Sequence, residues 1–306
     1  MKLKLFDAHC DTAFELYRKG EHLENNSCHI DLNRAGNYEN YGQLFAFCSL
    51  SGIRNLPWSA EELLLKPLEY LCREIEANKD IISLASSGEE AAKLHRNGKM
   101  AALLSIEGAE VIDCDPDRLQ WLREQGFVMT TMTWNADNAL AGFHGGTAGM
   151  TEQGRVFVRQ AEDLGMLIDV SHLSESSFWD LMKVTRGPIV ASHSNCRRLC
   201  DHSRNLTDDQ LRAISDTGGA VGLNLYPVFL GERANFDCLY RHLEHMLSIL
   251  GEKHVMLGGD LDGCDTLTDG FAGVESYADF YDFLQSKGFA ESLLEDIFYN
   301  NLLRLL

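Results

Sequence analysis

From residue 100 to the end of the chain, short apolar runs alternate with amphipathic segments of helical length. The runs are nearly continuous in apolar, often β-branched residues, which is typical of parallel strands buried on both faces. Expected strands cover residues 100–107, 127–134, 166–172, 188–193, 220–226 and 254–260, and two more lie upstream at 3–9 and 43–50. The pattern therefore predicts a parallel sheet covered by helices.

Helix-start and helix-stop signals occupy most of the gaps between these runs. Leucines recur at helical spacing over residues 59–78, and residues 151–164 open on Thr151 and end before Gly165. Further helices are expected over residues 174–186, 207–217, 237–250 and 276–306. Eight strands with a helix after nearly every one predict an α/β fold, a (β/α)8 barrel of the TIM type.

The main alternative is a doubly wound open sheet. It is weakened because the Gly-x-Gly-x-x-Gly pattern expected after its first strand is absent. The chain has 306 residues, enough for one large domain or two ordinary ones. Neither a linker nor a change in composition divides it, so we expect a single domain over residues 1–306.

Composition and charge exclude several functional classes. With 45% hydrophobic and 24% charged residues, the chain is globular rather than disordered or fibrous. Its 46 acidic and 27 basic residues give a net charge of −19, which repels phosphate backbones, so nucleic acid is not an expected partner. Nine cysteines, an odd number, argue against a disulfide framework. Since no signal-peptide core, membrane-spanning run or lipid-anchor signal is visible, we expect a cytoplasmic protein without a membrane anchor.

Ionisable side chains stand at the ends of the predicted strands, where a barrel of this type carries its active site. In chain order they are His9, Asp11, Glu107, His172, His193 and Asp260. His9 and Asp11 are two residues apart on a strand, so both side chains project to the same face. Each residue alone has an ordinary structural explanation. Together they predict a metal site, since imidazole and carboxylate are ligands for zinc and similar divalent ions.

The residues favour two metal ions over one, because five ligands exceed what a tetrahedral zinc needs. The natural division places His9 and Asp11 on one ion, His172 and His193 on the other, and Glu107 between them. A hydroxide bridging ions roughly 3.5–4 Å apart would be a nucleophile near neutral pH, because metal coordination lowers the pKa of water.

Asp260 is expected to act with Glu107 in catalysis. It lies in the run LGGDLDG and could accept the proton from the nucleophile and pass it to a leaving amine. Asp262 is a second carboxylate in the same run, but Asp260 lies nearer the strand end.

The order of these residues resembles that of one known family. The matching segments are His9-x-Asp11, Glu107-Gly108, Ser171-His172, Ser192-His193-Ser194, Arg204-Asn205 and Gly258-Gly259-Asp260-x-Asp262-Gly263. Their combination, along essentially the whole chain, is similar to the membrane dipeptidase (renal dipeptidase-like) family of binuclear zinc peptidases. The resemblance implies a (β/α)8 metal-dependent hydrolase that uses two Zn2+ per chain to hydrolyse dipeptides, with tolerance for a D-residue at the C-terminal position. It also suggests a homodimer.

The resemblance implies three substrate-binding residues as well. Arg204 matches the arginine that binds the free carboxylate of the substrate, and a guanidinium fork suits a carboxylate. Tyr226 matches a tyrosine of the pocket. Trp134 departs from the family, because the animal members have at its place a histidine thought to steady the tetrahedral intermediate. An indole N–H donates one hydrogen bond but carries no positive charge, and His144, ten residues further on, is a candidate for the missing role.

Two other functions stay open on the sequence alone. One is a different metallo-amidohydrolase that acts on N-acyl amino acids or cyclic amides. Such barrels more typically open with His-x-His, so Asp11 and Glu107 favour the dipeptidase. The other is a barrel that binds metal without catalysing a reaction, which the tryptophan at position 134 leaves open.

Overall fold

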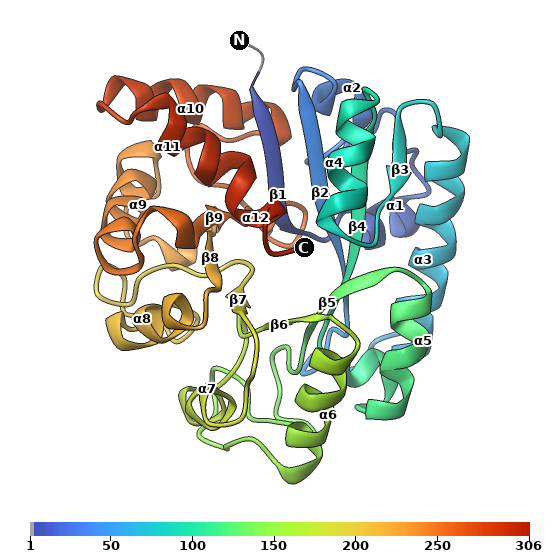
Figure 1. Ribbon diagram of the computed structural model, residues 1–306. Helices are drawn as coiled ribbons and strands as arrows, with labels where there is room; N and C mark the ends of the chain where they lie inside the picture. The colour runs from blue at the N-terminus through green and yellow to red at the C-terminus, as the bar shows by residue number, and fades with distance from the viewer. Residues whose placement is uncertain (1–2) are drawn as a thin grey trace.

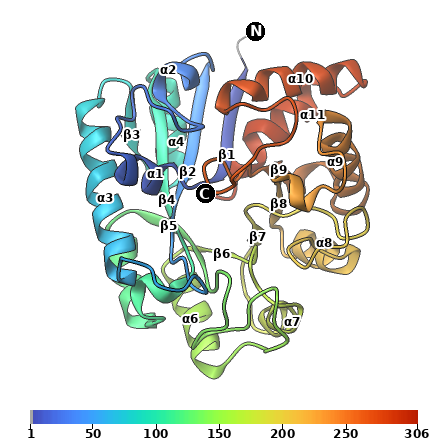
Figure 2. The ribbon, with the colours of Figure 1, turned by 180° about the vertical axis from the view of Figure 1, so that it is seen from behind.

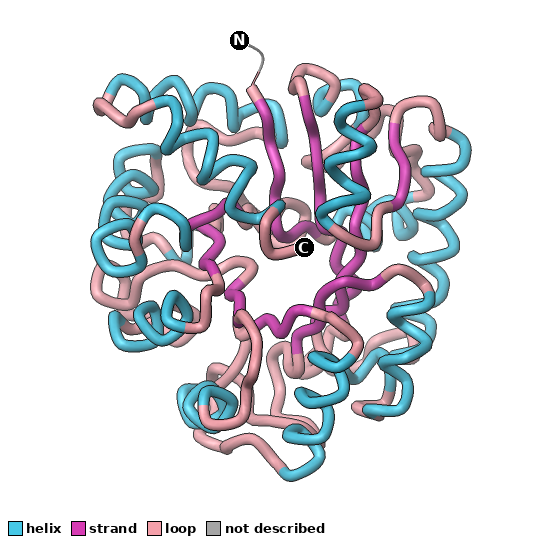
Figure 3. The backbone as a smooth tube through the Cα atoms, in the orientation of Figure 1, coloured by secondary structure: helices cyan, strands magenta, loops and turns pink. Residues whose placement is uncertain are grey.

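Eight parallel strands form a closed ring in the computed structural model, which describes residues 3–306 (Figures 1 and 3). The strands of the ring are β1 (Lys4–Cys10), β2 (Asn40–Cys48), β4 (Met100–Glu107), β5 (Phe127–Thr131), β6 (Leu167–Asp169), β7 (Ile189–Ala191), β8 (Ala220–Leu223) and β9 (Val255–Leu257). Each strand pairs in parallel with its neighbours, and β1 pairs with both β2 and β9, which closes the ring. The predicted (β/α)8 barrel is confirmed.

A ninth strand, β3 (Ile82–Leu84), stands outside the ring. It pairs with the first residues of β4, on the edge where β5 pairs with the later ones. The sequence pattern did not predict this strand, because three residues are too few to show a period.

Helices form an outer layer around the ring, as the front and back views show (Figures 1 and 2). They are α1 (Thr12–Lys19), α2 (Leu32–Ala35), α3 (Ala60–Ala77), α4 (Gly88–Arg96), α5 (Leu119–Glu124), α6 (Glu152–Asp163), α7 (Glu175–Met182), α8 (Asp208–Asp216), α9 (Phe236–Leu250), α10 (Tyr277–Ser286), α11 (Glu291–Glu295) and α12 (Asn301–Leu303). Short 3₁₀ turns η1 (Ala109–Ile112), η2 (Pro116–Arg118), η3 (Pro227–Phe229), η4 (Glu252–His254) and η5 (Val274–Ser276) and the π-helical turn η6 (Asp296–Asn300) complete the set. Within residues 3–306, no helix has the length and apolar character needed to cross a bilayer.

The end of the chain and the end of β5 differ from the prediction. The segment 276–306, expected as one helix, is divided into α10, α11, η6 and α12. The first break falls at Gly288, whose φ of 94° lies in the left-handed region that ends helices. β5 stops at Thr131, so Trp134 lies in the loop that follows the strand rather than at its end.

Side chains fill the barrel interior in layers. The first layer is apolar and includes Phe6, Leu44, Leu103, Met129, Leu167, Val190 and Met256, all buried. Tyr299 and Leu302 of the C-terminal segment belong to the same cluster and pack against this layer. Two residues further along their strands come Ser105, Thr131, Asp169 and Ser192, also buried, which we call the polar layer. The open end of the barrel lies beyond the polar layer.

A bulge near the end of β1 turns His9 into the barrel. Phe6 belongs to the interior layer, so strict alternation would point Cys10 inward. The register of β1 on β2 shifts between Asp7 and Cys10, and Cys10 packs in the outer core instead. His9 and Asp11 therefore share a face, as their spacing predicts. Because of the bulge, it is the odd-numbered residues that point inward here, whereas at the start of the strand it is the even-numbered ones.

Candidate active site

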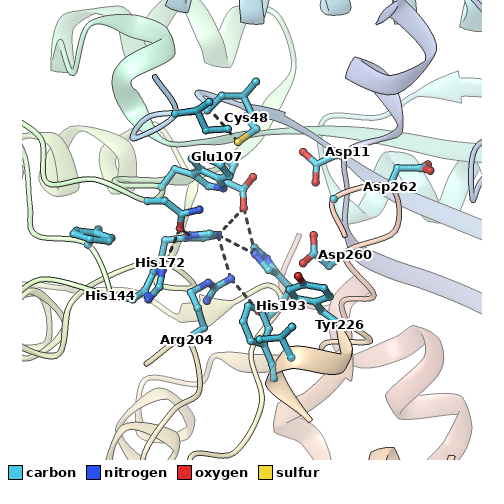
Figure 4. Close-up of a pocket in the computed structure, with 18 of the residues that line it drawn as sticks. Asp11, Cys48, Glu107, His144, His172, His193, Arg204, Tyr226, Asp260 and Asp262 are labelled. Carbon is cyan, nitrogen blue, oxygen red and sulfur yellow. Dashed lines mark hydrogen bonds and ion pairs between the residues drawn. The ribbon is translucent and has the colours of Figure 1, made fainter. Parts of the chain in front are cut away.

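All nine predicted site residues gather at one cavity at the C-terminal ends of the strands. Figure 4 labels seven of them: Asp11, Glu107, His172, His193, Arg204, Tyr226 and Asp260. The cavity has a volume of about 660 Å³. Eight of the nine residues line it, namely Asp11, Glu107, Trp134, His172, His193, Arg204, Tyr226 and Asp260. The ninth, His9, is 1% exposed and lies within contact of this group. The rest of the lining is largely apolar and includes Phe14, Leu50, Ile53, Phe143, Val228 and Phe229.

Glu107 stands at the centre of the cluster. It is the last residue of β4 and continues the inward-facing series that starts at Leu103. Its Oε1 lies 2.8 Å from Nε2 of His172, 3.2 Å from Nε2 of His193 and 3.5 Å from Nε2 of His9. One carboxylate oxygen therefore faces three imidazole nitrogens that come from the ends of three different strands.

The surroundings of His9 fit a shared cation better than hydrogen bonds. Its Nε2 lies 3.5 Å from Oδ2 of Asp11 and 3.9 Å from Oδ1 of Asp260, and it makes no hydrogen bond within residues 3–306. Two ligands bound to one zinc at ordinary distances stand roughly 3.4 Å apart in tetrahedral geometry. A buried nitrogen without a hydrogen bond, at that spacing from carboxylates, has the geometry expected of a metal ligand.

The contacts of His172 leave its Nε2 without a proton. Nδ1 lies 3.2 Å from Oδ1 of Asn135, which is an acceptor, so Nδ1 is the donor. Arg204 donates from Nη2 to Nε2 over 3.1 Å. Burial, and then the charge of Arg204, lowers the pKa of His172 to about 3, so the ring is a neutral imidazole. The carboxylate of Glu107 also lies beside Nε2, and a divalent cation between them would take over the lone pair that here accepts from Arg204.

The charges of the site are balanced only by added protons or a cation. Burial opposes a charge on His9, but Glu107, Asp11 and Asp260 together raise its pKa to about 10. Burial, with Glu107, raises the pKa of Asp11 to about 6, and burial, with Asp11 and Glu107, raises that of Asp260 to about 7. A metal ion would replace these protons, since ligands must be deprotonated to bind it.

Three overlapping groups of ligand atoms lie close enough to hold metal ions. They are His9, Asp11 and Glu107; Glu107, His172 and His193; and His9, His193 and Asp260, and within each group the atoms lie within 4.8 Å of one another. The donor set of imidazole and carboxylate groups and the unpaired Nε2 of His9 both fit a metal.

Arg204 reaches the cavity with one nitrogen unpaired. It is 3% exposed, its guanidinium lies 5.3 Å from the centre of the Phe229 ring, and Nη1 has no hydrogen-bond partner within residues 3–306. A buried guanidinium with a free N–H pair can bind a carboxylate, which accepts two parallel hydrogen bonds.

The two candidate acid/base carboxylates, Asp260 and Asp262, differ in their hydrogen bonds. Asp262 accepts hydrogen bonds from Oγ1 of Thr12 at 2.5 Å and from the amide of His29 at 2.7 Å, so its oxygens hold loops together. Within residues 3–306, the carboxylate of Asp260 accepts one side-chain hydrogen bond, from Nδ2 of Asn224 at 3.2 Å, and its other oxygen lies 3.9 Å from Nε2 of His9. Asp260 therefore has the accessible lone pairs that a general base needs.

Trp134 and His144 both lie at the rim, but His144 does not supply the missing positive charge. The centre of the Trp134 ring lies 6.2 Å from the centre of the His172 ring. His144 contacts Oδ1 of Asn135 at 3.1 Å and Oγ of Ser203 at 2.8 Å. Burial, then Arg204, lowers the pKa of His144 to about 3, so the ring is neutral at pH 7.

Several residues of the site were not singled out from the sequence. Asn224 directly follows β8, so its place at a strand end is a signal that could have found it. Asp169 lies inside an apolar run, where a carboxylate is costly unless it is bonded, and that is also a signal. Phe143 comes from a loop and Phe229 from the turn η3, and neither carries such a signal.

Comparisons with known proteins identify the family to which the chain belongs. The family model described as "Membrane dipeptidase (Peptidase family M19)" matches residues 1–306. A Klebsiella pneumoniae protein described as an uncharacterized protein in the pqqA 5' region is 32% identical over 266 residues, which cover 82% of this chain and 98% of that protein. An uncharacterized dipeptidase of Schizosaccharomyces pombe is also 32% identical, and the match covers 84% of this chain and 65% of that protein.

Two solved structures share the whole fold. A metallo peptidase from Rhodobacter sphaeroides, liganded with a phosphinate mimic of the dipeptide L-Ala-D-Ala, superposes with a TM-score of 0.91 at 27% identity, over 100% of this chain and 99% of that one. A structure described as dipeptidase AC of family M19 has a TM-score of 0.90 at 28% identity, over 100% and 98% of the two chains. With the family match spanning the chain, these likenesses establish that this protein belongs to the membrane dipeptidase family, peptidase family M19, and is a metallopeptidase of the dipeptidase type.

Proposed function

We propose that this protein is a zinc dipeptidase that holds two Zn2+ and cleaves dipeptides, including those with a D-residue at the C-terminal position. The observation that carries the proposal is the meeting of three imidazole nitrogens at one carboxylate oxygen of Glu107, within 2.8–3.5 Å. His9 and Asp11 would hold one ion, His172 and His193 the other, and Glu107 would be shared. Bound zinc would supply the activation of water and the polarisation of the scissile carbonyl.

Arg204 would bind the free carboxylate of the substrate. Its unpaired Nη1 is buried, and its Nη2 lies 3.1 Å from the ligand His172, so a carboxylate held there stands next to the metal site. This placement suits a substrate only two residues long, because the carboxylate and the scissile bond of a dipeptide are separated by a single residue. Longer peptides would have their carboxylate too far from the cluster.

Asp260 would transfer the proton. One oxygen is held by Asn224, and the other faces His9 and the cavity. Burial raises the pKa of Asp260 to about 7 in the metal-free site, and nearby positive charge would lower it, so the carboxylate can accept a proton and return it to the leaving amine.

Two observations support tolerance for a D-residue. The R. sphaeroides enzyme, 27% identical, is described with a mimic of L-Ala-D-Ala. In this chain Phe143, Val228 and Phe229 line the same cavity as Arg204, and apolar contacts of this kind are less directional than hydrogen bonds, so they can accept a side chain in either configuration.

The test is metal content measured together with peptidase activity. Purified protein would be loaded with zinc and assayed against Xaa-L-Ala, Xaa-D-Ala and N-acetyl amino acids. We expect two equivalents of zinc per chain and cleavage of both dipeptide sets. Faster cleavage of the N-acetyl set would favour another amidohydrolase function. Two bound metals with no cleavage of any dipeptide would favour a barrel that binds metal without catalysis.

A further inference from the structure

The polar layer contains a buried carboxylate that is not itself a predicted ligand. Asp169 is 0% exposed and ends β6, three residues before His172. The structure gives its carboxylate five hydrogen bonds, all from backbone amides or hydroxyl groups. Such a set fixes the orientation of the carboxylate, and in each of these five contacts a carboxylate oxygen is the acceptor.

The hydroxyl proton of Ser192 therefore points to the carboxylate of Asp169. Oγ of Ser192 lies 2.5 Å from Oδ2 of Asp169, and this short contact requires Ser192 to donate. Ser171 likewise donates from its Oγ to Oδ1 of Asp169 at 2.6 Å. Each hydroxyl has one hydrogen, so neither donates to the other across the 3.2 Å that separates them. Toward every further neighbour, Ser192 acts as an acceptor.

Those further neighbours are two predicted metal ligands. Nδ1 of His193 lies 2.7 Å from Oγ of Ser192, and Nδ1 of His9 lies 3.5 Å from the same oxygen. Because Ser192 accepts, Nδ1 of His193 must carry the proton. Its Nε2, which faces Oε1 of Glu107 at 3.2 Å, then presents a lone pair. His9 has no other hydrogen-bond partner for Nδ1 within residues 3–306.

The backbone carbonyl of Ser192 is tightly packed between neighbouring segments of the barrel. A Cβ at Gly222 would lie 1.9 Å from the carbonyl oxygen of Ser192, and a Cβ at Gly258 would lie 1.7 Å from it. Only glycine fits at both positions, so β8 and the residue that follows β9 pack directly against the carbonyl of Ser192. The backbone of Ser192 is thus fixed by close packing, and its hydroxyl is held by Asp169.

We propose that Ser192, with its proton fixed by Asp169, is a positioning residue that sets the Nδ1–H tautomer of His193 and also orients His9. One hydroxyl would then accept hydrogen bonds from one ligand of each metal ion, whereas His172 would be oriented by Asn135. The inference rests on the proposed two-metal function for its effect on metal binding, but not for the tautomer itself. Loss of a partner that orients a ligating histidine typically costs 10–100-fold in metal affinity, so we expect about that loss for both ions.

Ser192→Ala tests the proposal, and Thr131→Val is its matched control. Oγ1 of Thr131 donates to the same carboxylate over 3.1 Å and is also buried, but it has no hydrogen bond to a predicted metal ligand. Two quantities would be measured: zinc affinity for each equivalent by chelator competition, and the tautomer of His193 by long-range 15N–1H spectra of 15N-histidine-labelled, metal-free protein. We expect Ser192→Ala to weaken both equivalents about 10–100-fold and to shift His193 away from the Nδ1–H form. Thr131→Val should change neither, even if it lowers stability.

Several results would overturn the positioning role. Affinities and tautomer unchanged in Ser192→Ala would do so, and so would a loss confined to one equivalent. If the variant does not fold, the native protein still decides, because His193 with its proton on Nε2 contradicts the hydrogen-bond assignment directly. Native protein that binds no zinc but shows the Nδ1–H tautomer would instead refute the proposed function and leave the assignment standing.

Discussion

Nε2 of His172 and Nε2 of His193 lie 3.2 Å apart, and both face Oε1 of Glu107. Neither nitrogen has a proton to donate to the other, because the contacts of both rings place the proton on Nδ1. Two lone pairs and a carboxylate oxygen so close together repel one another unless a cation lies among them. This grouping makes Glu107 the residue on which the site depends most.

Glu107→Gln should therefore remove metal and activity together. An amide is a weaker ligand than a carboxylate and removes the negative charge that both ions would share. Removal of a residue that only orients a ligand typically lowers metal affinity 10–100-fold, so removal of a ligand itself should lower it by more than about 100-fold. Metal content by mass spectrometry and dipeptide hydrolysis would be measured side by side. Glu110→Gln, three residues further on in η1, is the control and should retain both. Full metal content in Glu107→Gln would contradict the bridging role.

Arg204→Lys should raise KM for dipeptides more than it lowers kcat. Lysine keeps the charge but loses the planar pair of donors that binds a carboxylate. Hydrogen bonds to charged groups contribute about 1.5–3 kcal/mol, so a 10- to 150-fold rise in KM is expected. The same substitution should have little effect on a dipeptide amide, which lacks the carboxylate. Arg198→Lys, exposed on the surface, is the control. An equal penalty on acid and amide substrates would show that Arg204 does not bind the carboxylate.

Trp134→His should raise kcat for dipeptides. The Trp134 ring lies 6.2 Å from the ring of His172, so a side chain here can reach a substrate at the metal site. A protonated imidazole donates charge-assisted hydrogen bonds, which are roughly twice as strong as the neutral bond of an indole, and a gain of up to about tenfold follows. Steady-state kinetics with one dipeptide would measure it. A fall in kcat would indicate that Trp134 itself contributes to the reaction by packing or by its N–H.

The position of the site could be predicted from the sequence better than the details of the strands that carry it. Predicted strand 166–172 is observed as β6, Leu167–Asp169 only, because Ser171 and Ser192 bond to the carboxylate of Asp169 rather than continuing the ladder. The predicted ligand His172 thus follows a turn, yet it lies at the open end of the barrel because the strand before it leads there.

What could not be predicted depends on contacts between distant segments. The spacing of His9 and Asp11 gave their shared face, but the direction of that face depends on the bulge in β1, which only its pairing with β2 reveals. The neutral state of His144 likewise depends on burial and on Arg204, sixty positions along the chain. Local patterns do not contain such information.

A buried histidine outside the site should make the stability of the protein depend on pH. His242 in α9 is 1% exposed; its Nδ1 accepts from the amide of Cys196 and its Nε2 donates to the carbonyl of Leu230, so the native ring is neutral. Burial lowers its pKa from 6.5 to about 4. The unfolded chain therefore binds more protons between these values, and the free energy of unfolding must fall as pH drops from about 6.5 toward 4.

The expected loss attributable to His242 is up to about 3 kcal/mol, from a shift of about 2.5 units at 1.36 kcal/mol each. Urea denaturation of metal-free protein at about pH 7 and about pH 4.5 would measure it, since removing metal beforehand excludes the effect of metal release. His242→Gln should be less stable than the native protein at pH 7 but should lose less stability on acidification. His22→Gln, whose side chain is 77% exposed, is the control and should follow the native protein. An identical loss in the native protein and in His242→Gln would mean that other buried groups cause the acid sensitivity, because a residue that cannot titrate in either state contributes nothing to the slope.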